Sequence, residues 1–280
     1  MAQEKPLTSA ISYTVAKPVP SWHLGLVLRR FVPWITVLVV LIVWQAITML
    51  QLIQPFLIPA PGDVLNEAIL VLQNGTLWVH IQATMGPVFA GLGVGISLAV
   101  ALGYCIARFP LLEDILSPLI IALQSTPVVA YAPLLVIWFG SGPNSKIITS
   151  ALIVFFPMLL NTVAGLRNVP PGLRDLMRSL RATPWQTFTR LEVPAAMPVL
   201  MSGLKISATL AVIGAVVGEF ISANAGLGFL INLARSQYDT PLVFVAVLTL
   251  TVLARLLYSL AAWLEYRALY WQRHGRYLPK

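Results

Sequence analysis

The stretch TMGPVFAGLGVGISLAVALGYCIA, residues 84–107, is a run of 24 residues without a charged side chain. About 20 consecutive apolar residues in a helix are enough to cross the hydrocarbon core of a bilayer. The stretch therefore predicts a membrane-spanning helix. Its glycines would let another helix approach closely, and the spacing of Gly91 and Gly95 makes them a candidate dimer face.

The composition outside this stretch supports the same class. Of the 280 residues, 58% are hydrophobic and 10% are charged, whereas soluble globular domains carry about 25% charged residues. Five further apolar runs, at residues 32–50, 115–139, 146–165, 195–221 and 241–263, are long enough to span a bilayer. We predict an all-α membrane protein with about six transmembrane helices: residues 1–31 precede a membrane domain at 32–264, and 265–280 form a tail.

The basic residues predict how the chain is oriented. The segment 51–83 has no Lys or Arg, whereas the loop between the fourth and fifth runs has five Arg residues: Arg167, Arg174, Arg178, Arg181 and Arg190. Both terminal segments are also basic, with Lys5, Lys17, Arg29 and Arg30 before the first run and Arg267, Arg273, Arg276 and Lys280 after the last. Short cytoplasmic loops are enriched in basic residues, so both termini and the Arg-rich loop are expected in the cytoplasm. The formal charge of +8 is thus explained by topology, and no nucleic-acid partner is expected.

The Arg-rich loop, residues 166–194, predicts two short helices. Apolar residues at i, i+3, i+4 and i+7 form one face of the first helix, and arginines form another: Leu173, Leu176, Met177, Leu180; Arg174, Arg178, Arg181. Thr183, Pro184 and Gln186 fit a capping box that starts a second helix, expected to end before Pro194. Such a basic amphipathic loop either lies on anionic lipid head groups or docks a soluble partner.

The sequence DLMRSLRATPWQTFTRLEVP, residues 175–194, resembles the EAA loop of ABC importer permeases. Asp175 matches the acidic position of that pattern, and Leu191 and Pro194 match its closing positions. The sequence departs from the pattern at residues 176–177, where small residues are usual, and at Arg181, where glycine is usual. The resemblance covers roughly residues 34–263, and LIPAPGDV at 57–64 is similar to the outer segment of the taurine, sulfonate, nitrate, thiamine-precursor and riboflavin permeases.

The resemblance implies a type I ABC importer permease in a bacterial inner membrane. Its expected partners are two copies of an ATP-binding subunit, an extracytoplasmic substrate-binding protein and a second permease subunit, expected to be another copy of this chain. The coupling loop would meet the ATPase through Asp175, Arg178, Ser179, Arg181, Ala182, Leu191 and Pro194. No Gly-x-x-x-x-Gly-Lys-Ser/Thr run is present, so ATP hydrolysis is expected in the partner, and neither enzymatic activity nor a cofactor is expected in this chain.

Five polar residues within the predicted spans are candidates for the solute path or gate. Gln124, Ser125 and Thr126 precede Pro127, where a broken helix would expose backbone groups to a cavity; Asn161 is similar. The alternative is a proline kink whose freed groups bond to the neighbouring Ser and Thr side chains. Glu219 is either a gate residue or a carboxylate paired with Ser222, Asn224 or a neighbouring helix. The three histidines, His23, His80 and His274, have no metal-ligand spacing.

The stretches AVIGAVVGEF at 211–220 and DLMRSL at 175–180 are more similar to the thiamine-precursor and riboflavin permeases. The resemblance therefore favours a heterocycle similar to riboflavin or a thiamine precursor as the transported substrate. Taurine, sulfonate or nitrate uptake is the alternative. A stand-alone secondary transporter would call for inverted repeats or ion-coupling charges, and a membrane enzyme for a cluster of reactive side chains. Neither feature is visible in the sequence.

Overall fold

The computed structural model describes residues 23–54 and 56–271, and all regular secondary structure in these ranges is helical. This confirms the all-α class. The chain divides into two units, Met1–Leu52 and Ile53–Lys280. The first contains α1 (His23–Met49), whose described side chains from Trp34 to Val43 are mostly apolar and exposed, as expected for a helix facing lipid.

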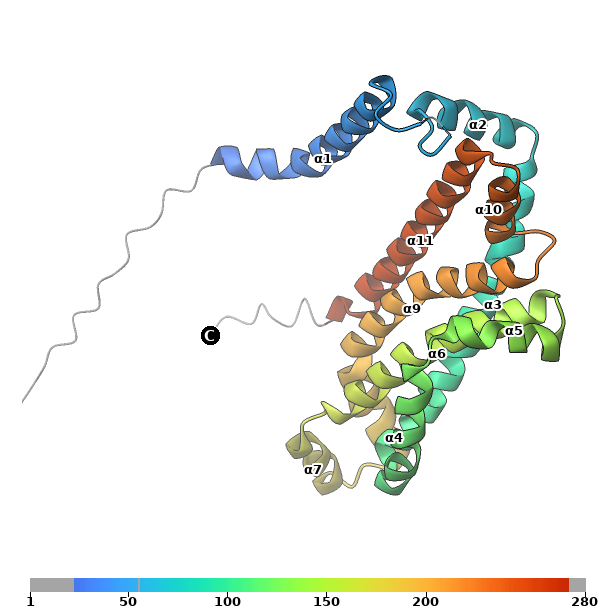
Figure 1. Cartoon of the computed structure of the whole chain (residues 1–280). Helices are drawn as coiled ribbons and strands as arrows, with labels where there is room; N and C mark the ends of the chain where they lie inside the picture. Colours follow the sequence, from blue (N-terminus) through green and yellow to red (C-terminus); the bar gives the residue numbers. More distant parts are fainter. Residues whose placement is uncertain (1–22, 55, 272–280) are drawn as a thin grey trace, which may run out of the picture. The chain divides into compact units, whose positions relative to one another are not determined.

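Three long helices form the centre of the second unit (Figure 1): α3 (Thr76–Arg108), α6 (Pro143–Arg167) and α9 (Val193–Ile221). Helix α6 packs along both others. Ser150 of α6 lies between Gly91 of α3 and Gly214 of α9, and its hydroxyl donates to the Ala211 carbonyl at 3.0 Å. A Cβ on Gly214 would lie 2.5 Å from the Ser150 Cα, so only glycine allows this approach.

The glycines of residues 84–107 therefore serve packing within the chain. Gly91 faces Ser150, and Gly95 faces Ala151 and Val154, all on α6. The prediction of a dimer face at Gly91 and Gly95 is wrong, because the chain's own α6 fills the space in front of them.

Four helical segments of the described residues are long and apolar enough to cross a membrane: α3, α6, the continuous helical stretch Pro184–Ile221, and α11 (Thr240–Ala268). A fifth span is present if α4 (Pro110–Ser125) and α5 (Val128–Phe139) count as one. A shorter apolar stretch, Trp34–Met49, lies in α1 and corresponds to the first predicted span. The orientation of the termini and the predicted domain boundaries stay predictions.

The interruption predicted at Thr126-Pro127 is a sharp bend of 94° between α4 and α5. Proline disfavours helical geometry in the residue before it, and Thr126 is extended, with φ −87° and ψ 127°. The Ser125 and Thr126 hydroxyls donate to the Ile121 and Ala122 carbonyls. These bonds are the ones expected of a kink whose freed groups are satisfied locally.

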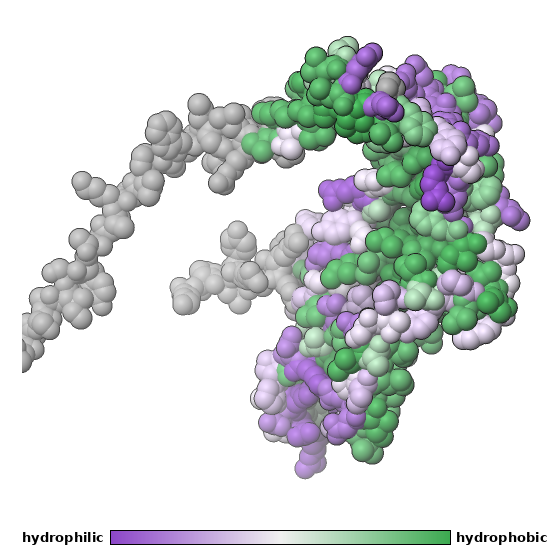
Figure 2. Space-filling view, in the orientation of Figure 1, coloured by the Kyte–Doolittle hydropathy of each residue, from purple (hydrophilic) through white to green (hydrophobic). Residues whose placement is uncertain are grey.

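Short helices connect the long ones. Helix α2 (Pro61–Gln73) precedes α3, and α10 (Leu227–Ser236) lies between α9 and α11. In the Arg-rich loop, α7 (Pro171–Ser179) is followed by α8 (Pro184–Thr187), and both hydrogen bonds of the Thr183–Gln186 capping box are present. Figure 2 shows hydrophilic residues over this loop and hydrophobic residues over the long helices.

The prediction that the second loop helix ends before Pro194 is wrong. A π turn, Phe188–Glu192, joins α8 to α9, and the Val193 N–H bonds to the Phe188 carbonyl five residues earlier. A proline inside an α-helix clashes with the carbonyl four residues before it. The wider turn comes just before Pro194, so the helix continues through the proline instead of stopping.

Candidate functional site

The turn after α7 has the hydrogen bonds of a Schellman motif. The Ala182 N–H bonds to the Met177 carbonyl at 3.0 Å, and the Arg181 N–H bonds to the Arg178 carbonyl at 2.9 Å. This places Arg181 where glycine normally ends a helix, in the left-handed conformation with φ 51°. The turn expected of glycine is therefore kept with arginine in its place.

The predicted coupling residues fall into two groups. Asp175, Arg178, Ser179 and Arg181 are exposed, and the side chains of Asp175 and Arg178 form an ion pair of 3.2 Å while 67% and 83% accessible. Ala182, Leu191 and Pro194 are half-buried. Only the first group is available to a partner without rearrangement of the loop.

Apolar side chains surround this exposed group. Leu176, Leu180 and Trp185 are all more than half exposed. A helix that presents both charges and large apolar side chains offers a surface that a lipid head group or a protein groove can cover.

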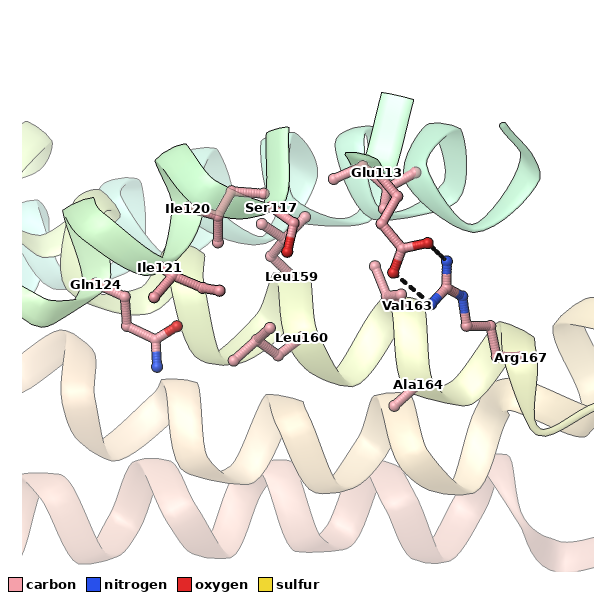
Figure 3. A pocket seen from close by; sticks show the side chains of 11 residues that line it. Glu113, Ser117, Ile120, Ile121, Gln124, Leu159, Leu160, Val163, Ala164 and Arg167 are labelled. Atoms are coloured by element: carbon pink, nitrogen blue, oxygen red, sulfur yellow. Dashed lines mark hydrogen bonds and ion pairs between the residues drawn. The ribbon is translucent and has the colours of Figure 1, made fainter. Parts of the chain in front are cut away.

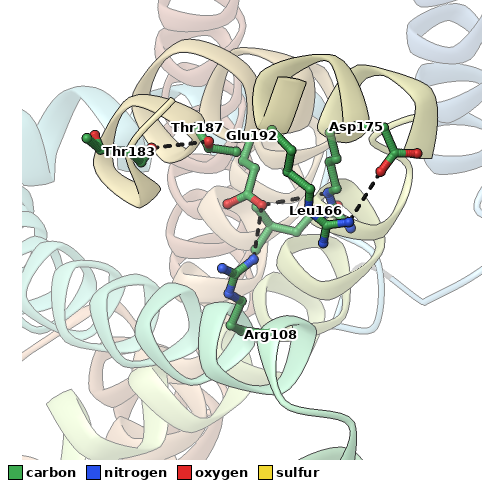
Figure 4. A network of polar contacts seen from close by, with 8 residues as sticks. Arg108, Leu166, Asp175, Thr183, Thr187 and Glu192 are labelled. Atoms are coloured by element: carbon green, nitrogen blue, oxygen red, sulfur yellow. Dashed lines mark hydrogen bonds and ion pairs between the residues drawn. The ribbon is translucent and has the colours of Figure 1, made fainter. Parts of the chain in front are cut away.

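A buried ionic cluster lies beneath α7 (Figure 4). Glu192 is buried, and its Oε1 lies 3.8 Å from an Arg108 guanidinium nitrogen and 3.7 Å from the Arg174 Nε. Arg174 also donates to the Leu166 carbonyl at 2.9 Å. The sequence analysis gave no role to Glu192 or Arg108. The available signal was that Glu192 is the sole acidic residue between Asp175 and Glu219.

A pocket of about 360 Å³ lies along α4 and α6, with Ile106 of α3 also in its wall (Figure 3). Gln124 is at one end, and the bidentate Glu113–Arg167 ion pair is at the other. The walls between them are mainly apolar: Ile120, Ile121, Leu159, Leu160 and Val163, with Ser117 as a further polar group. The two charges at this pocket neutralise each other.

The structure does not gather the predicted path residues in one place. Gln124 lines the pocket, but Ser125 and Thr126 bond to their own helix. The Asn161 amide donates to the Pro157 carbonyl at 2.8 Å, and its side chain packs against Gly203 of α9. Of this group, Gln124 is the residue whose surroundings fit contact with a solute.

Glu219 is buried at the end of α9 opposite Glu192. Its Oε2 accepts the Gly228 N–H at 2.7 Å, while the Gly226 and Leu227 N–H groups donate to His80 Nδ1 and Thr84 Oγ1. These bonds fasten the segment between α9 and α10 to α3. The surroundings favour a paired carboxylate over a gate residue. The donor belongs to a neighbouring helix, as one of the alternatives expected: it is the Gly228 N–H of α10 rather than Ser222 or Asn224.

A second polar pair escaped the sequence analysis. Lys205 of α9 and Glu265 of α11 are 2.7 Å apart, each 21% accessible. Lys205 falls inside the predicted fifth span, and Glu265 lies just after the predicted sixth. An isolated lysine in an apolar run signals a buried partner, but it does not say where that partner is.

Residues 91–270 match the family model described as binding-protein-dependent transport system inner membrane component. The chain is 41% identical over 238 residues to the riboflavin transport system permease protein RibX of Chloroflexus aurantiacus, covering 85% of this chain and 89% of RibX. It is 34% identical over 241 residues to the formylaminopyrimidine transport permease protein ThiX of Halalkalibacterium halodurans, covering 86% and 96%.

The fold is also similar to a solved structure. The MetNI methionine ABC transporter in an inward-facing conformation superposes with a TM-score of 0.62 at 18% identity, covering 69% of this chain and 96% of that one. At this identity the likeness concerns the fold alone. It confirms the fold expected from the EAA-loop resemblance.

Proposed function

This chain belongs to the family of binding-protein-dependent transport system inner membrane components, and from that premise we propose how its loop and pocket serve an ABC importer. As a member it is a multi-pass membrane protein and the permease subunit of such an importer. In our proposal it moves a small organic solute, delivered by an extracytoplasmic binding protein, across a bacterial inner membrane. Two copies of the permease would pair, and each would dock an ATPase subunit on residues 171–194.

The observation that carries the docking proposal is the geometry of α7 and its turn. Arg181 stands at the position where the family pattern has glycine, and it adopts the left-handed conformation that glycine favours. The loop can therefore keep its turn with arginine in that position. The exposed Asp175–Arg178 pair and the neighbouring Leu176 and Leu180 provide a mixed surface of charge and apolar area. Apolar area at the centre with charges around it is the usual pattern of a protein interface.

Docking can be tested by affinity capture from native membranes in mild detergent. We expect the wild-type chain to retain an ATP-binding subunit and the double variant Asp175→Lys, Arg178→Glu to lose it while still inserted in the membrane. The matched control is Arg235→Glu, an exposed charge on α10 far from α7 in the sequence. Wild-type chain that carries no ATPase in several detergents would contradict the proposal and favour a stand-alone transporter.

The pocket along α4 and α6 supports a neutral solute. Its volume of about 360 Å³ lies within the range of small-molecule sites, and the Gln124 amide can donate and accept hydrogen bonds. The Arg167 guanidinium is already bound by the Glu113 carboxylate and is not free to bind an anion. The substrate in our proposal is therefore a flat heterocycle resembling riboflavin or a thiamine precursor, in line with the names of RibX and ThiX.

Uptake measurements distinguish the substrates. In cells that express the chain with its own binding protein and ATPase, labelled riboflavin or formylaminopyrimidine should accumulate, and Gln124→Ala should lower that uptake at least several-fold. Asn161→Ala, outside the pocket, is the control. Accumulation of taurine or nitrate instead, unaffected by Gln124→Ala, would contradict both the substrate and the subsite.

A further inference from the structure

We propose that Glu192 is a positioning residue that fastens α7 to the end of α3, so that movement of α7 is passed on to the long helices. The inference rests on the proposed function, because it concerns how a docked ATPase would drive this chain. Nothing in the family pattern of acid, small residues, glycine and closing proline includes this position.

The Glu192 carboxylate is buried beside two cations. The Glu192 side chain is 5% accessible and lies between two guanidinium groups, those of Arg108 and Arg174. A carboxylate buried this far is strongly unfavourable unless cations face it. The distances of 3.7 and 3.8 Å are those of ionic attraction rather than of fixed hydrogen bonds, so the attraction persists through small displacements of α7.

Arg108, Arg174 and Glu192 belong to three different helical elements. Arg108 ends α3, Arg174 lies in the first turns of α7, and Glu192 ends the π turn before α9. Arg174 also donates to the Leu166 carbonyl near the end of α6. The Glu192 carboxylate thus connects α7 to α3 and to the start of α9, and the Arg174–Leu166 hydrogen bond connects α7 to α6.

The π turn that contains Glu192 also packs against α3. One extra residue in a helical turn shifts the direction of the side chains that follow, and such turns occur frequently at functional sites. Here Thr189 and Arg190 remain exposed while Glu192 is buried. The Phe188 ring in the same turn packs edge-on against Tyr104 of α3, with ring centroids 5.1 Å apart, so the turn meets α3 through both an apolar and an ionic contact.

The central test is Glu192→Gln, which keeps the shape and removes the charge. The control is Arg235→Gln, an exposed charge on α10 that lies outside the docking segment. In the complete transporter reconstituted in lipid, we expect Glu192→Gln to retain the ATPase subunit and its hydrolysis of ATP, while solute uptake falls about tenfold or more. Unchanged uptake, or loss of the ATPase subunit from the complex, would overturn the proposal.

A second measurement needs no partner. Hydrogen exchange of the α7 amides in the purified chain should be about tenfold faster in Glu192→Gln than in wild type or Arg235→Gln, because one anchor of α7 is gone. Exchange at the wild-type rate would show that Glu192 does not hold α7. This readout is independent of the ATPase, so it separates failure of the anchor from failure of the importer assignment.

A charge-swapped pair covers the case in which Glu192→Gln does not fold. Glu192→Arg combined with Arg174→Glu should restore both membrane insertion and uptake relative to either single change. Restored insertion without uptake, or failure of both Glu192→Gln and the charge-swapped variant to insert, would reduce Glu192 to a residue of structural stability and overturn its role in transmission.

Discussion

Substitution of Gly226 by alanine tests whether Glu219 is the anchor of the segment between α9 and α10. Gly226 has φ 125° and ψ 162°, a region almost restricted to glycine. A Cβ at this position would also collide with the Glu219 carboxylate. Two separate penalties therefore apply at one residue, and the chain offers a control that carries one of them.

Gly140 provides that control. Its φ of 80° and ψ of 172° lie in the same glycine-only region, but a Cβ there would have open space around it. We expect Gly140→Ala to lower the free energy of unfolding by about 1 to 3 kcal/mol through backbone strain alone. Gly226→Ala should cost about 2 kcal/mol more, because overpacking adds roughly 1 to 3 kcal/mol and displaces the buried bonds of this segment.

The assay is thermal denaturation of the purified chain in detergent, followed by size-exclusion chromatography. An excess of about 2 kcal/mol corresponds to a midpoint roughly 4 to 8 °C lower for Gly226→Ala than for Gly140→Ala. In a Glu219→Ala background the collision is absent, so Gly226→Ala should there cost no more than Gly140→Ala. Equal midpoints for the two glycine variants in the wild-type background would refute the account of Glu219 as the anchor.

Three further predictions concern charged residues. Arg181→Gly should leave hydrogen exchange of residues 177–183 unchanged, whereas the β-branched Arg181→Val should cost about 1 to 2 kcal/mol in the left-handed turn and speed exchange there. Lys205→Ala should lower the free energy of unfolding by about 2 to 3 kcal/mol by leaving Glu265 unpaired, while Lys205→Met with Glu265→Leu should cost less than about 1 kcal/mol in the same thermal assay. Partial burial and the nearby Asp239 raise the pKa of Glu67. Ionisation of Glu67 should therefore lower the free energy of unfolding as the pH rises from about 4 to 7. In a series of unfolding midpoints measured across this pH range, Glu67→Gln should show a smaller decline than wild type.

The long helices of this fold follow directly from the sequence, because a charge-free run of sufficient length has few alternatives to a membrane helix. Their ends were harder to predict. Helix α3 begins at Thr76 rather than at residue 84, since polar residues such as His80 and Gln82 continue the helix beyond the apolar run. In the structure, the Asn74 side chain accepts the Thr76 N–H and Gly75 adopts φ 76° just before the helix. Asn and Gly are the residue types that favour such a turn.

Pro194 misled the sequence analysis for a different reason. A proline ordinarily ends a helix because it lacks the N–H that would bond to the carbonyl four residues earlier. The local sequence gives no sign that a π turn before Pro194 will let the helix continue. The capping box at Thr183 and the turn at Arg181, by contrast, depend on neighbouring residues alone. The capping box was predicted, because both of its hydrogen bonds lie between Thr183 and Gln186. The left-handed turn at Arg181 was not predicted, because arginine stands where the family pattern has glycine.

The candidate sites show the same division between local and distant contacts. The exposed face of α7 follows from helical periodicity. The partners of Glu192 do not, because Arg108 lies on a different helix far away in the sequence. Glu219 was recognised as unusual, but its partner, the Gly228 N–H in the first turn of α10, becomes visible only when the helices are packed.

Helix α9 carries a buried carboxylate at each end, and the two differ in what holds them. Glu192 faces two arginines through ionic contacts, whereas Glu219 is held by a hydrogen bond from the Gly228 N–H. Between them Ser150 fills the space between two glycines, and a close-packed interior of this kind does not deform continuously. A force applied at α7 would therefore move α3, α6 and α9 together, carrying the segment held by Glu219 with them. Under the proposed docking, the ionic contacts of Glu192 lie at the end of the long helices where an ATPase would act, and the hydrogen bond of Glu219 lies at the other end.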